Sequence, residues 1–436
     1  MSFAPDRSSQ RPRPATDGAF RLSGQASLSA ASTLERRRET MHEHDHRSLG
    51  NRLDLFHQQE DGPGMVFWHP RGWALYRLIE EHIRKRMREA GYREVRTPQI
   101  LAQSIFRQSG HLEKAAETMF HFVQDDGRAW AVKPVSCPGH IQIFNQRLRS
   151  FRDLPMRYCE FGVVHRDEPS GALHGLMRAR QFTQDDAHVF CTPDQVEAEV
   201  RHFCRLQKRI YADFGFDRFE VRFSTRPAIR SGDDALWDKA EAALEAAARA
   251  AGLDPIRQPG EGAFYGPKLE FHLQDRLGRW WQCGTVQLDA VLPERMDVAY
   301  RDEQNGRAVP VILHHAVLGS LERFIGMLLE QYDGNLPLWL APEQIVIASI
   351  GAAQAEHAAS IRDRFVEAGL RAELDDGPET LARKIVAAHE AAIPLVGVIG
   401  AREERNGTIA LRHRDGAQEV LPVEAAIAKL GAAGIS

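Results

Sequence analysis

The stretch 158–190 constrains the fold of this chain more than any other part of its sequence. A run rich in aromatic and β-branched residues, 157–164, is followed by turn-forming residues at 169–171 and by a second, alternating run at 177–189. This pattern predicts two strands joined by a loop. One face of the second strand would carry Arg178, Arg180, Phe182, Gln184, Asp186 and His188. A surface hairpin with solvated charges is the alternative, but surface strands seldom gather such mixed chemistry on a single face.

Composition limits the classes to which the chain can belong. Its 436 residues predict two or three domains, and a net charge of −4 gives no overall basic field for nucleic acid, so RNA binding would need local patches. The five cysteines are odd in number and scattered, which favours a reducing compartment in which a functional cysteine acts as a ligand. No apolar run approaches the roughly 18 residues of a membrane helix. We therefore expect a soluble, cytoplasmic protein.

The sequence divides into three parts. Residues 1–44 are rich in Ser, Arg, Pro and Ala and predict a disordered tail; a transit peptide or an over-extended start are the alternatives. Residues 45–340 contain helical and strand-like periodicity in a mixed order, which predicts one large domain. Beyond the boundary near Pro342, strand-like and helical segments alternate through 341–436 and predict a compact α/β domain.

Within the large domain, helix signals are clear at three places. Pro70 opens a helix that ends at Gly91 and precedes a strand at 92–97. A capping box with proline at the first helical position, 192–195, opens a second helix, and 234–251 forms a third. Further strands are predicted at 219–223, 263–271 and 280–289, and 311–324 runs from strand into helix.

The order of residues in the central stretch, EFG..HR.EPSG.LHGL.R.R.FTQDDAH.F, closely resembles motif 2 of class II aminoacyl-tRNA synthetases, in the form found in threonyl-tRNA synthetases. Residues 70–98 resemble motif 1, 311–324 resemble motif 3, and 341–436 resemble the anticodon-binding domain. The resemblance implies an α+β fold with an antiparallel-sheet catalytic domain over 45–340 and a C-terminal α/β anticodon-binding-like domain. It also implies a homodimer formed through motif 1.

The resemblance implies an ATP site that uses Mg²⁺. Arg166 would bridge the amino-acid carboxylate and the α-phosphate, while Arg178 and Arg323 would hold the outer phosphates, because a planar guanidinium pairs bidentately with phosphate oxygens. Glu168 would accept a hydrogen bond from the adenine amino group, Phe182 would stack on the ring, and Gln282 would lie near the nucleotide.

The resemblance also implies an L-threonine site. Asp186 would hold the substrate ammonium, and Gln184, Tyr265 and Gln287 would border the amino acid. Cys137, His188 and His314 match the positions of three zinc ligands, which leave one coordination position open. Their spacing alone says nothing about zinc, because scattered Cys and His are usually core or surface residues. His111, in a Ser-Gly-His context within a polar loop, would lie beside the terminal ribose of tRNA and assist acyl transfer.

Three departures from the family pattern affect function. Val135 and Ser136 replace the usual Met and Asn beside Cys137, in the lining of the amino-acid pocket. Only the tail precedes the catalytic core, so we expect no cis-editing domain. The C-terminal part has about ten Lys and Arg against about fourteen Asp and Glu, an acidic balance that predicts weakened or lost anticodon reading.

Three functions remain open from the sequence. The first is a threonine–tRNA ligase that forms threonyl-adenylate and transfers threonine to tRNA(Thr). The second is a paralogue that activates threonine, or a similar amino acid, for another acceptor such as a carrier protein. The third is a non-catalytic regulator, against which the retention of every phosphate and zinc candidate argues.

Overall fold

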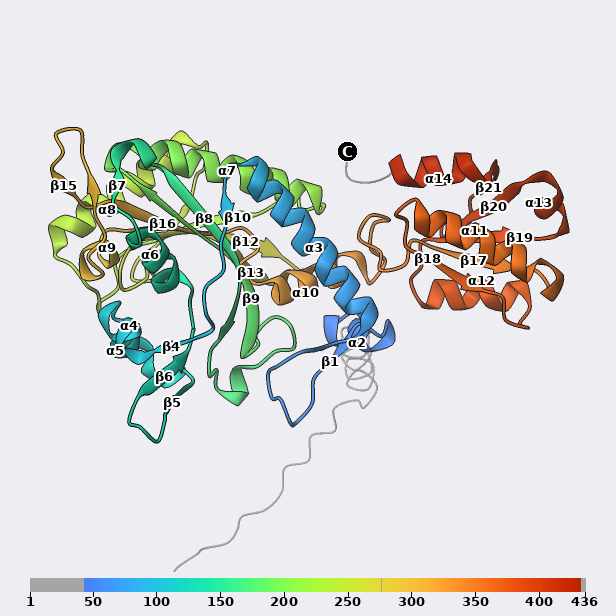
Figure 1. The fold of residues 1–436 in the computed structure, drawn as a ribbon, viewed down its shortest axis with the longest axis horizontal. Helices are drawn as coiled ribbons and strands as arrows, with labels where there is room; N and C mark the ends of the chain where they lie inside the picture. The colour runs from blue at the N-terminus through green and yellow to red at the C-terminus, as the bar shows by residue number, and fades with distance from the viewer. Residues whose placement is uncertain (1–42, 276, 433–436) are drawn as a thin grey trace, which may run out of the picture. The chain divides into compact units, whose positions relative to one another are not determined.

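The computed structural model describes residues 43–432 with the exception of residue 276 (Figure 1). The disordered tail predicted for residues 1–44 therefore lies almost entirely outside the described residues. The described chain contains one large sheet with helices packed against it, followed along the sequence by a separate five-stranded sheet with helices of its own (Figure 1).

The large sheet has eight strands in the order β11-β10-β12-β13-β16-β9-β8-β3. The edge pairs β10–β11 and β3–β8 are parallel, and the other neighbours are antiparallel, as predicted for the catalytic domain. The strands are β3 (Arg93–Glu94), β8 (Met156–His165), β9 (Gln181–Cys191), β10 (Glu220–Ser224), β11 (Ile256–Gln258), β12 (Lys268–Gln274), β13 (Trp280–Asp289) and β16 (Val311–Ala316).

Strands β8 and β9 are the two strands predicted from the central stretch. They pair antiparallel, with Tyr158 opposite His188 and Glu160 opposite Asp186. The odd-numbered residues 187, 189 and 191 of β9 pack into the main hydrophobic core, whereas the even-numbered 184, 186 and 188 line a pocket on the opposite face. The predicted alternation thus divides the sheet into a core face and a site face.

Four helices contribute to the main core on the core face: α3 (Pro70–Glu89), α7 (Val196–Asp213), α8 (Asp234–Ala250) and α10 (Leu321–Tyr332). Pro70 occupies the first turn of α3, and the predicted capping box at Thr192 precedes α7 through the short helix η4 (Pro193–Gln195). None of the helices in the described chain combines the length and apolar composition that a membrane crossing requires.

The site face is covered by α6 (Cys137–Asn145), whose Ile141 and Phe144 pack against Tyr158, Phe190 and Ile312 of the sheet. Next to it along the chain is a three-stranded sheet of β4 (Ile100–Ala102), β6 (Ala129–Val132) and β5 (His121–Val123). The short helices α4 (Gln103–Gln108) and α5 (His111–Ala115) follow β4. Two smaller sheets pair β1 (Phe56–His57) with β2 (Phe67–Trp68) and join β7 (Arg149–Ser150), β14 (Tyr300–Arg301) and β15 (Arg307–Ala308).

The C-terminal part has the strand order β18-β17-β19-β20-β21. The alternation of strands and helices predicted for this part is confirmed through β19. The later elements β20, β21, α13 and α14 were not predicted from the sequence. Its elements are β17 (Ile345–Ser349), α11 (Ala355–Glu367), β18 (Ala372–Asp375), α12 (Leu381–Glu390), β19 (Leu395–Ile399), α13 (Ala401–Asn406), β20 (Thr408–His413), β21 (Gln418–Pro422) and α14 (Val423–Ala432).

Three local predictions were wrong. The second strand of the central stretch begins at Gln181 rather than at residue 177, because the chain turns at Gly175, which has a φ of 51°. The strand predicted at 92–97 is only two residues long. The loop expected at Ser109-Gly110-His111 is a buried junction between α4 and α5, in which Gly110 has a φ of 85°.

Candidate functional site

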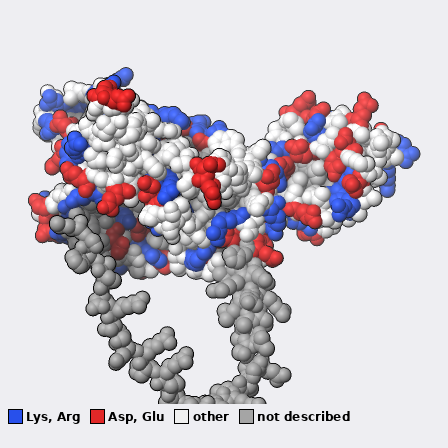
Figure 2. All heavy atoms as spheres, turned by 90° about the horizontal axis from the view of Figure 1, so that it is seen from below, with Lys and Arg blue, Asp and Glu red and all other residues white. Residues whose placement is uncertain are grey.

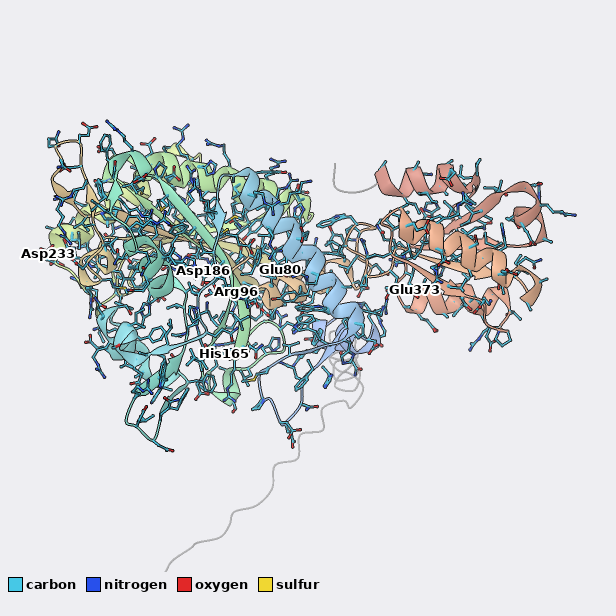
Figure 3. The ribbon with its side chains drawn as sticks, viewed as in Figure 1. Glu80, Arg96, His165, Asp186, Asp233 and Glu373 are labelled. Carbon is cyan, nitrogen blue, oxygen red and sulfur yellow. The ribbon has the colours of Figure 1, made fainter. Side chains whose placement is uncertain are left out.

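A pocket lies on the site face of the large sheet, where β9, β13 and β16 run side by side. Asp186, near the middle of this sheet in Figure 3, is one of its lining residues. All four residues predicted to contact the amino acid line it: Gln184, Asp186, Tyr265 and Gln287. The Tyr265 hydroxyl donates a hydrogen bond to Gln287 Oε1 at 2.5 Å, and burial raises the pKa of the Asp186 carboxyl above its usual range.

The three predicted metal ligands also line this pocket, and their ligand atoms all lie within 4.8 Å of one another. His188 and His314 face each other across the β9–β16 ladder, with His188 Nε2 and His314 Nδ1 3.0 Å apart. The other ring nitrogen of His314, Nε2, lies 2.9 Å from the buried Asp289 carboxylate. Cys137 is supplied by the first residue of α6.

The donor set at this position fits a zinc ion. Two imidazole nitrogens and one thiol sulfur are the ligand types that zinc prefers, and three protein ligands are typical of zinc sites with an open position. If His314 donates its Nε2 proton to Asp289, its Nδ1 lone pair points at His188, as in metal-bound histidines oriented by a carboxylate. Burial raises the pKa of the Cys137 thiol, so binding of a cation would release the thiol proton.

His111 lies directly beside the candidate metal ligands. Its Nε2 is 3.8 Å from Cys137 Sγ, and its Nδ1 is 2.9 Å from the Ser109 hydroxyl. Burial lowers the pKa of His111 to about 3, so its imidazole is neutral at pH 7. The Ser-Gly-His motif therefore places a buried, neutral histidine next to Cys137, where the sequence predicted a polar loop.

The predicted nucleotide-binding residues form a second group. Arg166 lines the pocket, donates from Nε to Pro134 O at 3.2 Å, and lies over the ring of Phe182 at 5.2 Å. Arg178 is exposed and pairs with Glu168 at 2.7 Å. Since Arg178 precedes β9 instead of lying within it, this arginine is held by the loop and not by the sheet.

Arg323, the arginine of the strand-to-helix stretch, is fixed by two main-chain carbonyls. Its Nε donates to Met177 O at 2.8 Å and its Nη1 to Gln282 O at 2.7 Å. Gln282, predicted to lie near the nucleotide, thus contributes its carbonyl to the position of Arg323. The guanidinium also lies 6.0 Å from the ring of Trp281.

Several residues that support the site were missed from the sequence. Asp185, on the core face of β9, accepts hydrogen bonds from the N–H groups of Val317, Leu318 and Gly319 and so fixes the turn between β16 and α10. Asp289 orients His314, and Thr285 lines the pocket. Thr285 and Asp289 share the site face with Gln287, so strand alternation was a signal that could have found them.

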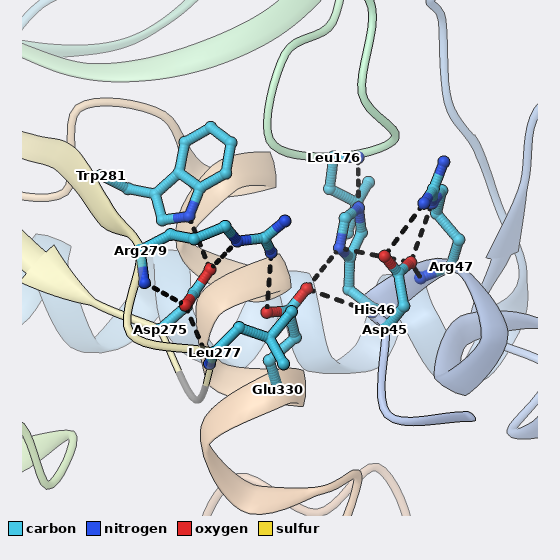
Figure 4. Close-up of polar contacts among 9 residues, drawn as sticks. All are labelled: Asp45, His46, Arg47, Leu176, Asp275, Leu277, Arg279, Trp281 and Glu330. Carbon is cyan, nitrogen blue, oxygen red and sulfur yellow. Dashed lines mark hydrogen bonds and ion pairs between the residues drawn. The ribbon is translucent and has the colours of Figure 1, made fainter. Parts of the chain in front are cut away.

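A second group of potential metal ligands, Asp45, His46 and Glu330, is also buried. Figure 4 shows that its polar atoms are already engaged: His46 Nε2 accepts from the Leu176 N–H at 3.1 Å, which leaves Nδ1 to donate to Glu330 Oε1 at 2.8 Å. Arg47 pairs with Asp45, and Arg279 reaches Glu330. We interpret this group as a structural link between the N-terminal helix α2 (His46–Arg52), the loop before β9 and the end of α10.

The surface charge agrees with the nearly balanced composition. On the face seen in Figure 2, acidic and basic side chains are interspersed and form no continuous basic band. Contacts to a polyanion on this face would therefore depend on local groups of arginines.

Two protein-family models match the chain. The "tRNA synthetase class II core domain (G, H, P, S and T)" matches residues 120–332, and the "Anticodon binding domain" matches residues 344–432. The first match contains every residue that lines the pocket, and the second contains all five strands of the C-terminal sheet.

Curated relatives carry a common description. The chain is 53% identical over 396 residues to a threonine–tRNA ligase of Caulobacter sp. strain K31 and 50% identical over 395 residues to that of Paramagnetospirillum magneticum. These matches cover 91% and 90% of the chain. The chain spans only 60% and 62% of the length of these two relatives.

Solved structures are similar in fold. The chain is 40% identical to the RNA binding domain of threonyl-tRNA synthetase from Cryptosporidium parvum, with a TM-score of 0.88 that covers 90% of this chain and 99% of the other. A putative threonyl-tRNA synthetase from Aeropyrum pernix gives 29% identity and a TM-score of 0.78, with coverage of 89% and 96%. Prolyl-tRNA synthetase from Giardia lamblia shares the fold at 18% identity, with a TM-score of 0.69 and coverage of 87% and 73%.

Proposed function

The chain belongs to the class II threonyl-tRNA synthetase family, and on this premise we propose that it acts as a threonine–tRNA ligase. It would activate L-threonine with ATP and transfer the threonyl group to tRNA(Thr). The observation that carries the proposal is the pocket in which an N/S metal-ligand set adjoins Asp186, Gln184 and the arginine Arg166. Such a pocket offers partners for a hydroxyl, an ammonium and a carboxylate at the same time.

The first reaction would be attack of the threonine carboxylate on the α-phosphate of ATP, with release of pyrophosphate. This chemistry demands alignment of the two reactants and dispersal of the phosphate charge. Arg166 would bridge the carboxylate and the α-phosphate, because its guanidinium adjoins the pocket and contacts Phe182. Arg178 and Arg323 would hold the outer phosphates with Mg²⁺, while Glu168 would accept from the adenine amino group.

Phe182 and Gln282 would complete the nucleotide site, with Phe182 stacked on the adenine and Gln282 near the nucleotide. In support, the Gln282 carbonyl fixes Arg323, and the charges of Glu168 and Arg178 act on Arg323 electrostatically. Arg323 therefore interacts with Gln282, Glu168 and Arg178, although these residues lie far from it in the sequence.

Selection of threonine would depend on a zinc ion held by Cys137, His188 and His314. When bound, zinc supplies an open coordination position that a β-hydroxyl fills and an isosteric methyl does not. Asp186 would pair with the substrate ammonium, which would compensate the buried carboxylate charge. Gln184, Tyr265 and Gln287 would border the side chain, with the Tyr265–Gln287 hydrogen bond limiting the rotation of both groups.

His111 would assist the transfer of threonine to the ribose of tRNA. In support, burial keeps its imidazole neutral, and its Nε2 lies 3.8 Å from Cys137 Sγ, which lines the amino-acid pocket. The proposed catalytic groups are therefore Arg166, Arg323 and His111.

We further propose a homodimer formed through residues 70–98 and a cytoplasmic location, which agrees with five cysteines that are all buried and free. Residues 45–340 would form the catalytic domain and residues 341–436 the anticodon-binding domain, with tRNA(Thr) contacting both. Transfer to a carrier protein is not favoured, because relatives that match about 90% of the chain are described as threonine–tRNA ligases.

Amino-acid-dependent pyrophosphate exchange tests the proposed activation and its specificity. Threonine should support exchange, and valine should be rejected by about 10⁴-fold or more because it would leave the polar groups of the site unpaired. Serine, which lacks only a methyl group, should be discriminated by roughly 10–200-fold. Exchange with valine as good as with threonine would contradict the proposal.

A further inference from the structure

Behind the candidate zinc site lies a chain of buried polar groups without an assigned role. Glu160 on β8 and His140 on α6 are 3% and 0% exposed, and Lys133 next to them is 1% exposed. His140 follows Cys137 by three residues on α6, so one helix face carries both a candidate metal ligand and this second histidine.

The Glu160 carboxylate is surrounded by hydrogen-bond donors. It accepts from Thr97 N at 2.9 Å, Thr97 Oγ1 at 2.8 Å, Lys133 Nζ at 3.0 Å and His140 Nε2 at 3.2 Å. Burial opposes ionisation, but the hydrogen bonds from His140, Thr97 and Lys133 outweigh it and lower the pKa of Glu160 to about 2. Glu160 is therefore an acceptor at neutral pH, and His140 Nε2 must carry the proton of their hydrogen bond.

The position of this proton determines the direction of the hydrogen bonds that follow. A neutral His140 that is protonated on Nε2 has a lone pair on Nδ1, which lies 2.7 Å from Nδ1 of His188. His188 must then donate from Nδ1, and its own lone pair is on Nε2, the nitrogen that faces His314. The order of donors, starting at an ionised carboxylate, thus selects one tautomer of His188.

On the other side of the site, a single carboxylate selects the tautomer of His314. Asp289 contacts His314 Nε2 directly at 2.9 Å and leaves the His314 Nδ1 lone pair pointing at His188. Two lone pairs that face each other at 3.0 Å repel unless a cation lies between or beside them. Both tautomers therefore suit a metal ion and are unfavourable without one.

We propose that His140 and Glu160 are positioning residues that hold His188 in the tautomer able to bind the metal ion through Nε2. The proposal rests on the proposed zinc site. In metal sites, loss of such an outer partner typically lowers metal affinity by 10–100-fold.

Zinc affinity, measured by competition with a colorimetric chelator, tests this role independently of enzyme activity. His140→Phe keeps the ring that packs edge-on against His188 but removes both nitrogens, and we expect its zinc affinity to fall 10–100-fold. His140→Asn, whose side-chain oxygen can still accept from His188 Nδ1, should lose less than His140→Phe. His202→Phe is the matched control, because His202 Nε2 donates to Ala90 O near the surface, and its zinc affinity should be unchanged.

The outcomes separate this proposal from the zinc site itself. Cys137→Ser should abolish tight zinc binding. The metal site would be overturned if the wild-type protein did not bind zinc, or if Cys137→Ser bound zinc as tightly as the wild type. Wild-type zinc affinity in a folded His140→Phe variant would overturn the positioning role alone. If circular dichroism shows that His140→Phe is unfolded, Glu160→Gln decides, because its neutral amide no longer fixes the proton on His140 Nε2: weaker zinc binding supports the role, and unchanged binding contradicts it.

Discussion

Arg166 is the residue on which the proposed activation would depend most directly. It reaches the amino-acid pocket and contacts Phe182, so one guanidinium connects the two proposed substrate subsites. A lysine at this position would keep the charge but lose the planar fork that pairs with carboxylate and phosphate oxygens.

We therefore expect Arg166→Lys to lower threonine-dependent pyrophosphate exchange by about 10²–10³-fold, the range observed when one preorganised electrostatic donor is lost. The exposed Arg147, changed to lysine in the same way, should leave exchange unaffected. Exchange within a few-fold of wild type in Arg166→Lys would show that Arg166 does not contact the reacting groups.

At the level of helices and strands, the short helix α2 is held in place by charge. Asp45 caps it by accepting from the Arg47 N–H at 2.9 Å, and the Arg47 side chain pairs with the same carboxylate. Burial opposes ionisation, yet the hydrogen bonds from Arg47 outweigh it and lower the pKa of Asp45 to about 2. Figure 4 shows how this pair adjoins His46 and Glu330.

A carboxyl group whose pKa is lower in the folded than in the unfolded state stabilises the fold above its unfolded pKa, near 4, and loses this effect as the pH falls towards 2. Asp45 should thus contribute about 2 kcal/mol at pH 7. We expect Asp45→Asn to melt at a lower temperature than wild type at pH 7, and the difference to shrink below about pH 4. Calorimetric melting at several pH values measures this, and a difference independent of pH would contradict it.

The elements that the sequence predicted best are those whose signal is local. The alternation in β9 placed Gln184, Asp186 and His188 on one face, and the structure brings all three to the pocket. Proline and the capping box marked the starts of α3 and of η4 before α7.

Residues whose partners are distant in sequence could not be predicted in this way. Glu160 depends on Thr97, Lys133 and His140, which meet only when β8, α6, the end of β6 and the segment between β3 and β4 pack together. Asp185 acts through amides that lie 132–134 residues away. The buried position of His111 was missed for the same reason, because the motif does not show what packs over it.

At the scale of the whole molecule, the proposed homodimer leads to a prediction about the mass of the protein in solution. The proposed homodimer should elute with a mass of twice the 49.1 kDa of one chain in size-exclusion chromatography with light scattering. A monomer that still exchanges pyrophosphate would contradict the proposed role of residues 70–98 in dimer formation.

The acidic balance of the C-terminal part predicted poor RNA binding, whereas this part matches the anticodon-binding domain over residues 344–432. The family match therefore favours tRNA as the acceptor, whereas the acidic charge of this part disfavours RNA binding. Basic and acidic side chains are interspersed on the face seen in Figure 2, so contacts with tRNA on this face would depend on shape and local pairs more than on a broad positive field.

The most direct measurement is transfer of labelled threonine to purified tRNA(Thr), with adenylate formation followed in the same reaction. We predict that adenylate forms and that threonine is then charged onto the tRNA. Adenylate without charging would contradict the ligase function and leave activation of threonine for a different acceptor; absence of both would contradict the proposed enzyme altogether.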